Sequence, residues 1–459
     1  MNQSDAVRTL LPKFRIVAAA GLMLGAGCSP KLHPVGGEFI RLGMPEPDLS
    51  RYRSPQDRPG QDPDLAVAMA ISGGGARSYN YAFGILQALE ADALLREIDY
   101  YSAVSGGCFA PAAYFAAQAL HRQQGGAGFR LSGPEAAWIR EALAHNYEWP
   151  VARAWLSPRF WFSRLNAGDA LERDLHRTLL RGQPLTLGHC YRPPDSPAPA
   201  PYPVLLANAT LYQPVGLFPF TPDLLDTFQV SGYTHQLRRI RQDTPIDPYS
   251  LPLSVAIRAS GTFPVAIPNA VLRSVRDPEY PYLQLFDGGA ADNLGHRTAI
   301  RVLAQDPAPR KVLLVVDADG ISLPSTYSRR PWTLPPKVYW DLALTGINAQ
   351  RTARRRDIEW QCEALGITPV FLSFDAWLEG HPATMEESVR LRPLRRELIR
   401  QLSEPGAALS MRERVLLCRA INAVPTRYRI SPADQELLIL AAHALVQLKA
   451  HELRAAMGQ

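Results

Sequence analysis

The sequence lacks the features on which several protein classes depend. It has five cysteines in 459 residues, with no CxxC pair and no HExxH stretch, so a zinc site is not expected. The apolar stretch at residues 16–25 is too short for a membrane span, which needs about 20 apolar residues. The net charge of +6 is not gathered in a basic stripe, which argues against a nucleic-acid partner. No acidic loop of the EF-hand kind is present, so calcium is not implied.

What is present is ordinary globular composition. The chain is 46% hydrophobic and 20% charged, which excludes collagen, a coiled coil and wholesale disorder. It is long enough to bury a large core. Composition does not break after residue 64, so we expect one domain over residues 64–459 rather than two, with a helical C-terminal extension. The polar, Pro- and Gly-containing residues 28–63 are expected to form a flexible tether.

Residues 1–27 are expected to be a targeting segment rather than part of the fold. The apolar stretch at 16–25 has the length of a secretory signal core, and small residues lead to Cys28. Three positive residues precede it: Arg8, Lys13 and Arg15. The segment resembles a bacterial lipoprotein signal, although Gly25 stands where that signal prefers Leu. The resemblance implies that Cys28 is lipidated and, with Ser29 next, that the protein is anchored in an outer membrane facing the periplasm. A plain signal peptide and a cytosolic chain are the alternatives.

The next part of the chain alternates strand and helix patterns. Residues 65–71 form a continuous apolar run between Pro63 and a glycine run, typical of a buried parallel strand. The pattern predicts further strands at 98–104, 204–211, 282–286, 312–316 and 368–374, and helices at 76–95, 108–121, 136–144, 169–180 and from 432; residues 254–259 fit either. This alternation predicts an α/β fold with a mainly parallel central sheet flanked by helices.

Two candidate motifs follow the first two strands. Gly73-Gly74-Gly75 opens a helix, where backbone N–H groups can turn toward a phosphate or an oxyanion. A phosphate-binding P-loop would need Gly-Lys-Ser/Thr, and Ser78 stands where a dinucleotide fingerprint needs Gly or Ala. Ser105, in the sequence Ala103–Gly107, has the pattern of a nucleophile elbow with Ala for the first Gly. Simple turns are the alternative for both motifs.

A third motif, Asp287-Gly288-Gly289, ends a later predicted strand. A carboxylate followed by two residues without side chains can approach another loop closely. The alternative is a turn Asp that caps the next helix, which is common.

Together the three motifs resemble the patatin-like phospholipase family, which has a GGGxR loop, a GxSxG serine and an Asp-Gly-Gly/Ala motif in this order. Further likenesses lie at residues 207–210, 259–264 and 286–294, so the resemblance spans roughly residues 65–320. The departures are Ala103, a Pro-rich insertion at 192–203, and a C-terminal part that matches no motif.

The resemblance implies a three-layer patatin-like fold and a serine lipid acyl hydrolase that needs no cofactor or metal. Ser105 would attack a phospholipid or lysophospholipid ester, with Asp287 as its base and no histidine. The loop of Gly73, Gly74 and Gly75 would form the oxyanion hole, chiefly through the N–H groups of Gly74 and Gly75. Arg77 would contact a substrate phosphate or hold that loop.

Several alternatives stay open. His296 follows Asp287 and would be the third member of an ordinary Ser-His-Asp triad. Asp317 and Asp319 also end a predicted strand and could supply the base. The fold could also belong to an inactive lipid-binding or structural lipoprotein. Two Arg clusters are either solvated helix faces or contacts for anionic headgroups: Arg351, Arg354, Arg355 and Arg356, and Arg392, Arg395 and Arg396.

We predict that Cys28 carries the lipid anchor. Replacing it, Cys28→Ser, should release the protein from membranes or leave its signal uncleaved, because no thiol remains to be acylated. Mass spectrometry of the mature N-terminus checks this. A mature chain that begins anywhere other than residue 28 would contradict the lipoprotein assignment.

Overall fold

The computed structural model describes residues 48–53, 61–126, 129–157, 167–193, 202–212, 216–233, 244–262, 267–318, 351–378, 391–404 and 409–458. Cys28 and the signal segment lie outside these ranges, as do the greater part of the Pro-rich insertion and Asp319. None of the helices in the described ranges is long and apolar enough to cross a membrane.

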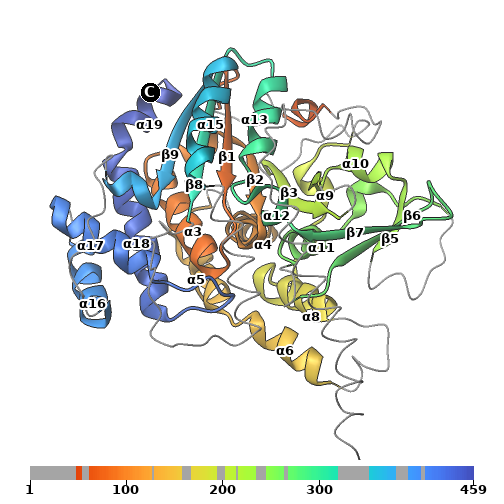
Figure 1. Cartoon of the computed structure of the whole chain (residues 1–459), viewed down its shortest axis with the longest axis horizontal. Helices are drawn as coiled ribbons and strands as arrows, with labels where there is room; N and C mark the ends of the chain where they lie inside the picture. The colour runs from red at the N-terminus through yellow and green to blue at the C-terminus, as the bar shows by residue number, and fades with distance from the viewer. Residues whose placement is uncertain are drawn as a thin grey trace, which may run out of the picture.

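The described strands form one nine-stranded sheet. Its order is β5-β6-β7-β3-β2-β1-β8-β9, and β4 pairs with β3 beside this path (Figure 1). Strands β3, β2, β1, β8 and β9 pair in parallel, whereas β4, β5, β6 and β7 pair antiparallel. The bounds are β1 Leu65–Ile71, β2 Ile98–Val104, β3 Val204–Leu211, β4 Gly216–Pro219, β5 Val230–Tyr233, β6 Ala270–Ser274, β7 Tyr282–Asp287, β8 Arg310–Asp317 and β9 Ile367–Ser373.

Helices cover both faces of the parallel centre. Every residue of β1, β2 and β3 is buried, as expected for parallel strands between two helical layers. Starting from β1, the strands β2 and β3 are added on one side of the sheet, and β8 and β9 are added on the other side. Right-handed crossovers therefore put α3 and α4 on one face and α15 on the opposite one, with α13 beside α15 across β1, β2 and β8. The predicted α/β fold with a mainly parallel sheet between helices is confirmed.

The helices continue into the C-terminal part, where α18 packs along α3 (Figure 1). The predicted start of α18 is confirmed: Ser431 caps it by accepting a hydrogen bond from the Asp434 N–H at 3.1 Å. The bounds are α3 Ala76–Ala91, α4 Phe109–Gln123, α5 Ala137–Ala144, α6 Glu148–Leu156, α8 Ala167–Asp174, α9 Leu187–Cys190, α10 Pro222–Thr227, α11 Leu253–Ser260, α12 Gly289–Asp292, α13 His296–Gln305, α15 Arg351–Ala364, α16 Leu391–Leu402, α17 Met411–Asn422, α18 Pro432–Leu448 and α19 Ala450–Met457.

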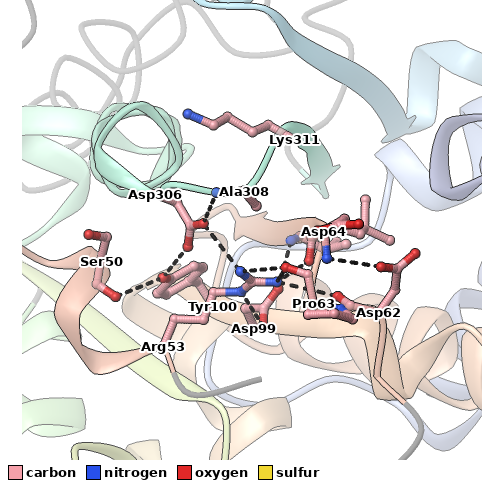
Figure 2. A network of polar contacts seen from close by, with 12 residues as sticks. Ser50, Arg53, Asp62, Pro63, Asp64, Asp99, Tyr100, Asp306, Ala308 and Lys311 are labelled. Atoms are coloured by element: carbon pink, nitrogen blue, oxygen red, sulfur yellow. Dashed lines mark hydrogen bonds and ion pairs between the residues drawn. The ribbon is translucent and has the colours of Figure 1, made fainter. Parts of the chain in front are cut away.

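The N-terminal residues of the described chain are anchored at the amino ends of the central strands (Figure 2). Arg53 places Nε 3.0 Å from Asp99 Oδ1 and Nη1 3.3 Å from Asp306 Oδ1, and all three side chains are at most 4% exposed. Tyr100 donates its hydroxyl proton to Asp306 Oδ2 at 2.8 Å. Leu49 is also buried. The prediction that residues 28–63 form a flexible tether is therefore wrong for residues 48–53, because apolar burial and an ion pair fix them to the sheet.

We predict that the Arg53 ion pairs are important for stability. Arg53→Ala leaves two buried carboxylates without their cation, and breaking a buried pair in this way typically costs about 3–5 kcal/mol. The free energy of unfolding in urea measures the loss. Arg400→Ala is the matched control, because Arg400 pairs with Glu397 and Glu404 in solvent. Equal urea midpoints for the two variants would contradict the prediction.

Candidate active site

The three motifs converge because neighbouring strands end at the same level. Ile71 in β1 pairs with Ala103 in β2, which pairs in turn with Ala207 in β3. The glycine run therefore begins beside the turn that carries Ser105. A Cβ added at Gly73 would lie 3.5 Å from Ser105 Cβ. The carboxyl ends of parallel strands are where sites form in open α/β sheets.

Ser105 occupies a strained turn between β2 and α4. Its φ is +52°, a conformation that costs an ordinary L residue about 1–3 kcal/mol. The turn is held by the Ser105 N–H, which donates to Ser260 Oγ at 2.8 Å. Gly106 lets the turn approach the glycine run, since a Cβ there would lie 2.6 Å from the Gly75 carbonyl oxygen. This is the geometry expected of a nucleophile elbow.

Asp287 reaches Ser105 from the antiparallel side of the sheet. The register of β7 on β3 puts Asp287 opposite Ala209. Gly288 follows, and it packs so closely on β3 that an added Cβ would lie 2.1 Å from the Asn208 carbonyl oxygen. The carboxylate is buried, and its Oδ1 accepts the Gly289 N–H at 2.8 Å.

The second carboxylate oxygen, Oδ2, faces no acceptor or donor at ordinary hydrogen-bond geometry within the described ranges. Burial raises the pKa of Asp287 to about 6, although the Gly289 N–H and the Ser105 hydroxyl each lower it. Hydrogen bonds between a nucleophile and its base are often long in unliganded sites. The pair thus has a hydroxyl beside a carboxylate whose pKa is raised toward neutrality.

The glycine run supplies two free N–H groups rather than three. The Gly73 N–H donates to the Asn293 carbonyl at 2.8 Å, so it is not available to an oxyanion, and its place in the predicted hole is corrected. Gly74 and Gly75 have φ of +134° and +58°, and in the described part of the chain neither N–H has an acceptor. These two N–H groups stand at the start of α3, where the helix dipole adds positive potential.

A comparison with known protein families identifies the family of this chain. A family model described as Patatin-like phospholipase matches residues 69–300, about half of the chain. The chain belongs to the patatin-like phospholipase family. No curated protein matches it.

Three solved structures are similar to this chain at low sequence identity. Human GIVD cytosolic phospholipase A2 is 15% identical with a TM-score of 0.41, over 86% of this chain and 60% of that one. The same protein in complex with methyl gamma-linolenyl fluorophosphonate is 16% identical with a TM-score of 0.43, over 86% of this chain and 59% of that one. VipD from Legionella pneumophila is 14% identical with a TM-score of 0.27, over 83% of this chain and 67% of that one. The chain thus spans about 60% of the length of the human protein.

The alternative bases lie elsewhere in the patatin-like domain. His296 is buried with Nδ1 2.8 Å from Asp292 Oδ1, and no contact among the described residues joins it to Ser105 or Asp287. Asp317 ends β8, beyond β1 from Ser105, and the Gly73 loop lies between them. Asp319 is outside the described residues.

Arg77 is buried at the start of α3. Its Nη1 donates to the Val424 carbonyl at 3.3 Å, which connects the glycine run to the C-terminal part. This contact favours the alternative that Arg77 holds the loop. A role in substrate binding stays a prediction.

Part of the two Arg clusters is used within the molecule. Arg355 pairs with Glu359 and Asp375 and lies 4.4 Å from the centre of the Phe371 ring. Arg395 pairs with Asp434 at 2.9 Å. These contacts favour a structural role within the fold for both residues, rather than binding of anionic headgroups. The side chains of Arg351, Arg354 and Arg392 lie outside the described ones.

The described cysteines and acidic groups form no metal cluster. Cys108, Cys190, Cys362 and Cys418 are buried free thiols. Within the described ranges, no group of three His, Cys, Asp or Glu side chains is placed to hold a metal ion.

Sequence reasoning missed several residues that build the site. Ser260 and Asn293 fall in stretches that resemble the family, at 259–264 and 286–294, and these stretches were the available signal for them. Tyr428 has no such signal. It comes from the loop between α17 and α18, far beyond the family match, yet its hydroxyl donates at 2.7 Å to the carbonyl of Gly261, the residue after Ser260.

We predict that Asp287→Asn raises thermal stability at alkaline pH. The pKa of Asp287 rises from 3.8 to about 6 on folding, so its charged form destabilises the fold above pH 6. As pH falls from 6 toward 4, the folded wild type takes up a proton and this cost disappears. The melting temperature of Asp287→Asn should therefore exceed that of the wild type by more at pH 8 than at pH 5. An equal difference in melting temperature between variant and wild type at both pH values would refute the raised pKa of Asp287. A variant that is less stable than the wild type at pH 8 would refute it as well.

Proposed function

We propose that the protein is a serine lipid acyl hydrolase that cleaves carboxylic ester bonds of phospholipids or lysophospholipids. The observation that carries the proposal is the strained turn of Ser105 beside the buried Asp287, with two free N–H groups at the adjacent glycine run. Membership of the patatin-like phospholipase family supports the same chemistry.

In the first half-reaction, the Ser105 hydroxyl proton passes to Asp287 Oδ2 as Oγ attacks the ester carbonyl carbon. The carbonyl oxygen becomes an oxyanion, which accepts hydrogen bonds from the N–H groups of Gly74 and Gly75. One such donor is worth roughly 2.7–4 kcal/mol in other enzymes. The tetrahedral intermediate then breaks its bond to the leaving oxygen, which takes the proton from Asp287 and departs as an alcohol.

The second half-reaction reverses these roles with water. Water gives a proton to Asp287 and attacks the acyl carbon, and the same two N–H groups hold the new oxyanion. Breakage of the bond to Oγ releases the fatty acid, and Asp287 returns the proton to Ser105. A carboxylate with a pKa of about 6 suits both directions, because it accepts and returns a proton near neutral pH.

We propose further that the enzyme acts at a membrane. The signal-like residues before Cys28 support a lipid anchor in an outer membrane, which would hold the domain near its substrate.

We predict that Ser105→Ala and Asp287→Asn each lower kcat/KM on p-nitrophenyl esters by at least about a thousandfold, since losing one member of a catalytic unit disables it. His296→Asn keeps a polar group toward Asp292 and should stay within a few-fold of the wild type. Wild-type activity in Ser105→Ala would reject the nucleophile. Correctly folded wild type without esterase activity on esters or phospholipids would instead favour a binding or structural lipoprotein.

We also predict the pH dependence of the reaction. The base must be ionised, so kcat/KM should fall about tenfold per pH unit below the Asp287 pKa of about 6. A histidine would titrate in the same range, near 6.5, so the profile is measured in His296→Asn as well. An acid limb that persists there supports Asp287. Its disappearance, with a modest loss in Asp287→Asn, would favour a Ser-His-Asp triad.

A further inference from the structure

The helix α6 presents large apolar side chains to solvent. Trp149, Trp155 and Leu156 are 59%, 37% and 79% exposed. Three of the nine large apolar or aromatic side chains that are exposed in the described part of the chain therefore lie on this nine-residue helix. Trp149 and Leu156 share one face of α6 with the exposed Arg153, because residues three or four apart in a helix are neighbours. Single exposed apolar side chains are common, but such a gathering marks an interaction surface.

The other side of α6 holds the helix on the domain. Val151 is buried, and α6 packs against α8. Figure 1 shows α6 at the lower edge of the molecule, below α8. Shortly before α6, His145 places Nε2 2.8 Å from Asp174 Oδ2 at the end of α8. The exposed face is therefore carried by a helix that is fixed to the fold.

The start of α6 lies next to the candidate active site. Tyr147, directly before the helix, makes an edge contact with Phe109, with 5.3 Å between ring centroids. Phe109 opens α4 directly after the turn that carries Ser105. The Oε1 of Glu148 accepts the Tyr428 N–H at 3.1 Å. A surface that binds α6 is therefore held close to the nucleophile.

The charge along α6 and beyond it is positive. Arg153 is exposed between Trp149 and Leu156, and by sequence residues 149–168 contain three Arg and neither Asp nor Glu. Trp side chains favour the headgroup level of a bilayer, where the ring meets apolar chains and the N–H meets water. Arg side chains are attracted by anionic headgroups. Trp, Leu and Arg without a carboxylate therefore complement an anionic bilayer surface, which is negative throughout.

We propose that the exposed face of α6, formed by Trp149, Arg153 and Leu156, docks on a bilayer that contains anionic phospholipids. The inference rests on the proposed function and deepens it, because it names the face by which the enzyme meets its lipid substrate. The anchor proposed at Cys28 would hold the protein at a membrane without fixing which side of the domain faces the lipid. Docking through α6 turns the candidate active site toward it.

The test compares Trp149→Ala with Trp360→Ala in the full chain. Both variants carry Cys28→Ser, as does their parent, so that no acyl chain masks the contribution of α6. Trp360 is the matched control, because it is 67% exposed on α15, on the face of the sheet opposite α4. Co-sedimentation measures binding to vesicles of equal parts phosphatidylglycerol and phosphatidylcholine. Hydrolysis is measured on the same vesicles and on a soluble p-nitrophenyl ester.

Trp149→Ala should lower the vesicle partition constant and the rate on vesicles together by about tenfold, because burial of one large apolar side chain is worth at least that. The rate on the soluble ester should stay within twofold of the parent. Trp360→Ala should change none of the three by more than twofold. Arg153→Gln should weaken partitioning by about fivefold, the worth of one Arg near an anionic surface, and should have no effect on vesicles of phosphatidylcholine alone.

Equal partitioning of Trp149→Ala and the parent, or equal losses in Trp149→Ala and Trp360→Ala, overturns the inference. So does a loss in Trp149→Ala that is as large on the soluble ester as on vesicles. A parent that is dimeric without lipid, in sedimentation velocity, and becomes monomeric in Trp149→Ala would show that a second copy covers α6. In each case, hydrolysis by the parent still supports the proposed function. A parent that binds vesicles through Trp149 and cleaves no ester overturns the proposed function alone.

Discussion

The site depends on the hydrogen bonds that Ser260 makes. Its Oγ accepts the Ser105 N–H at 2.8 Å and donates to the Asn208 carbonyl at 2.5 Å, so it joins the elbow to β3. The Ser260 carbonyl accepts the Gly288 N–H at 3.1 Å, which ties down the loop of Asp287 as well. One residue at the end of α11 therefore fixes the separation of hydroxyl and carboxylate, and a serine with positive φ needs such support.

The same arrangement lowers stability locally. Ser105 holds an unfavourable backbone conformation, and Asp287 keeps a carboxylate where water cannot solvate it. Both costs are offset by the surrounding fold: the fully buried strands β1, β2 and β3 on one side, and at their amino ends the ion pairs of Arg53. Strain and desolvation near the carboxyl ends of the strands go together with tight anchoring at the opposite ends.

Local patterns predict the parallel centre well, because its strands are rich in apolar residues and glycines follow β1 and β2 within two residues. β1, β2 and β3 have the expected bounds. They do not predict β4, β5 and β6, which are only four or five residues long. β4 pairs with β3, β6 pairs with β7, and β5 pairs with β6. The order of motifs is enough to place Ser105 near Asp287. It cannot say that the Gly73 N–H donates to the Asn293 carbonyl or that the Tyr428 hydroxyl donates to the Gly261 carbonyl, because both depend on contacts between distant segments.

The central claim is that Ser105 and Asp287 act as one unit. Reaction of the pure protein with a fluorophosphonate, followed by peptide mapping of the adduct by mass spectrometry, tests it most directly. The account predicts a single adduct, on the peptide that contains Ser105, and labelling slowed by orders of magnitude in Asp287→Asn. An adduct on a different residue, or labelling of Asp287→Asn at the wild-type rate, would contradict it.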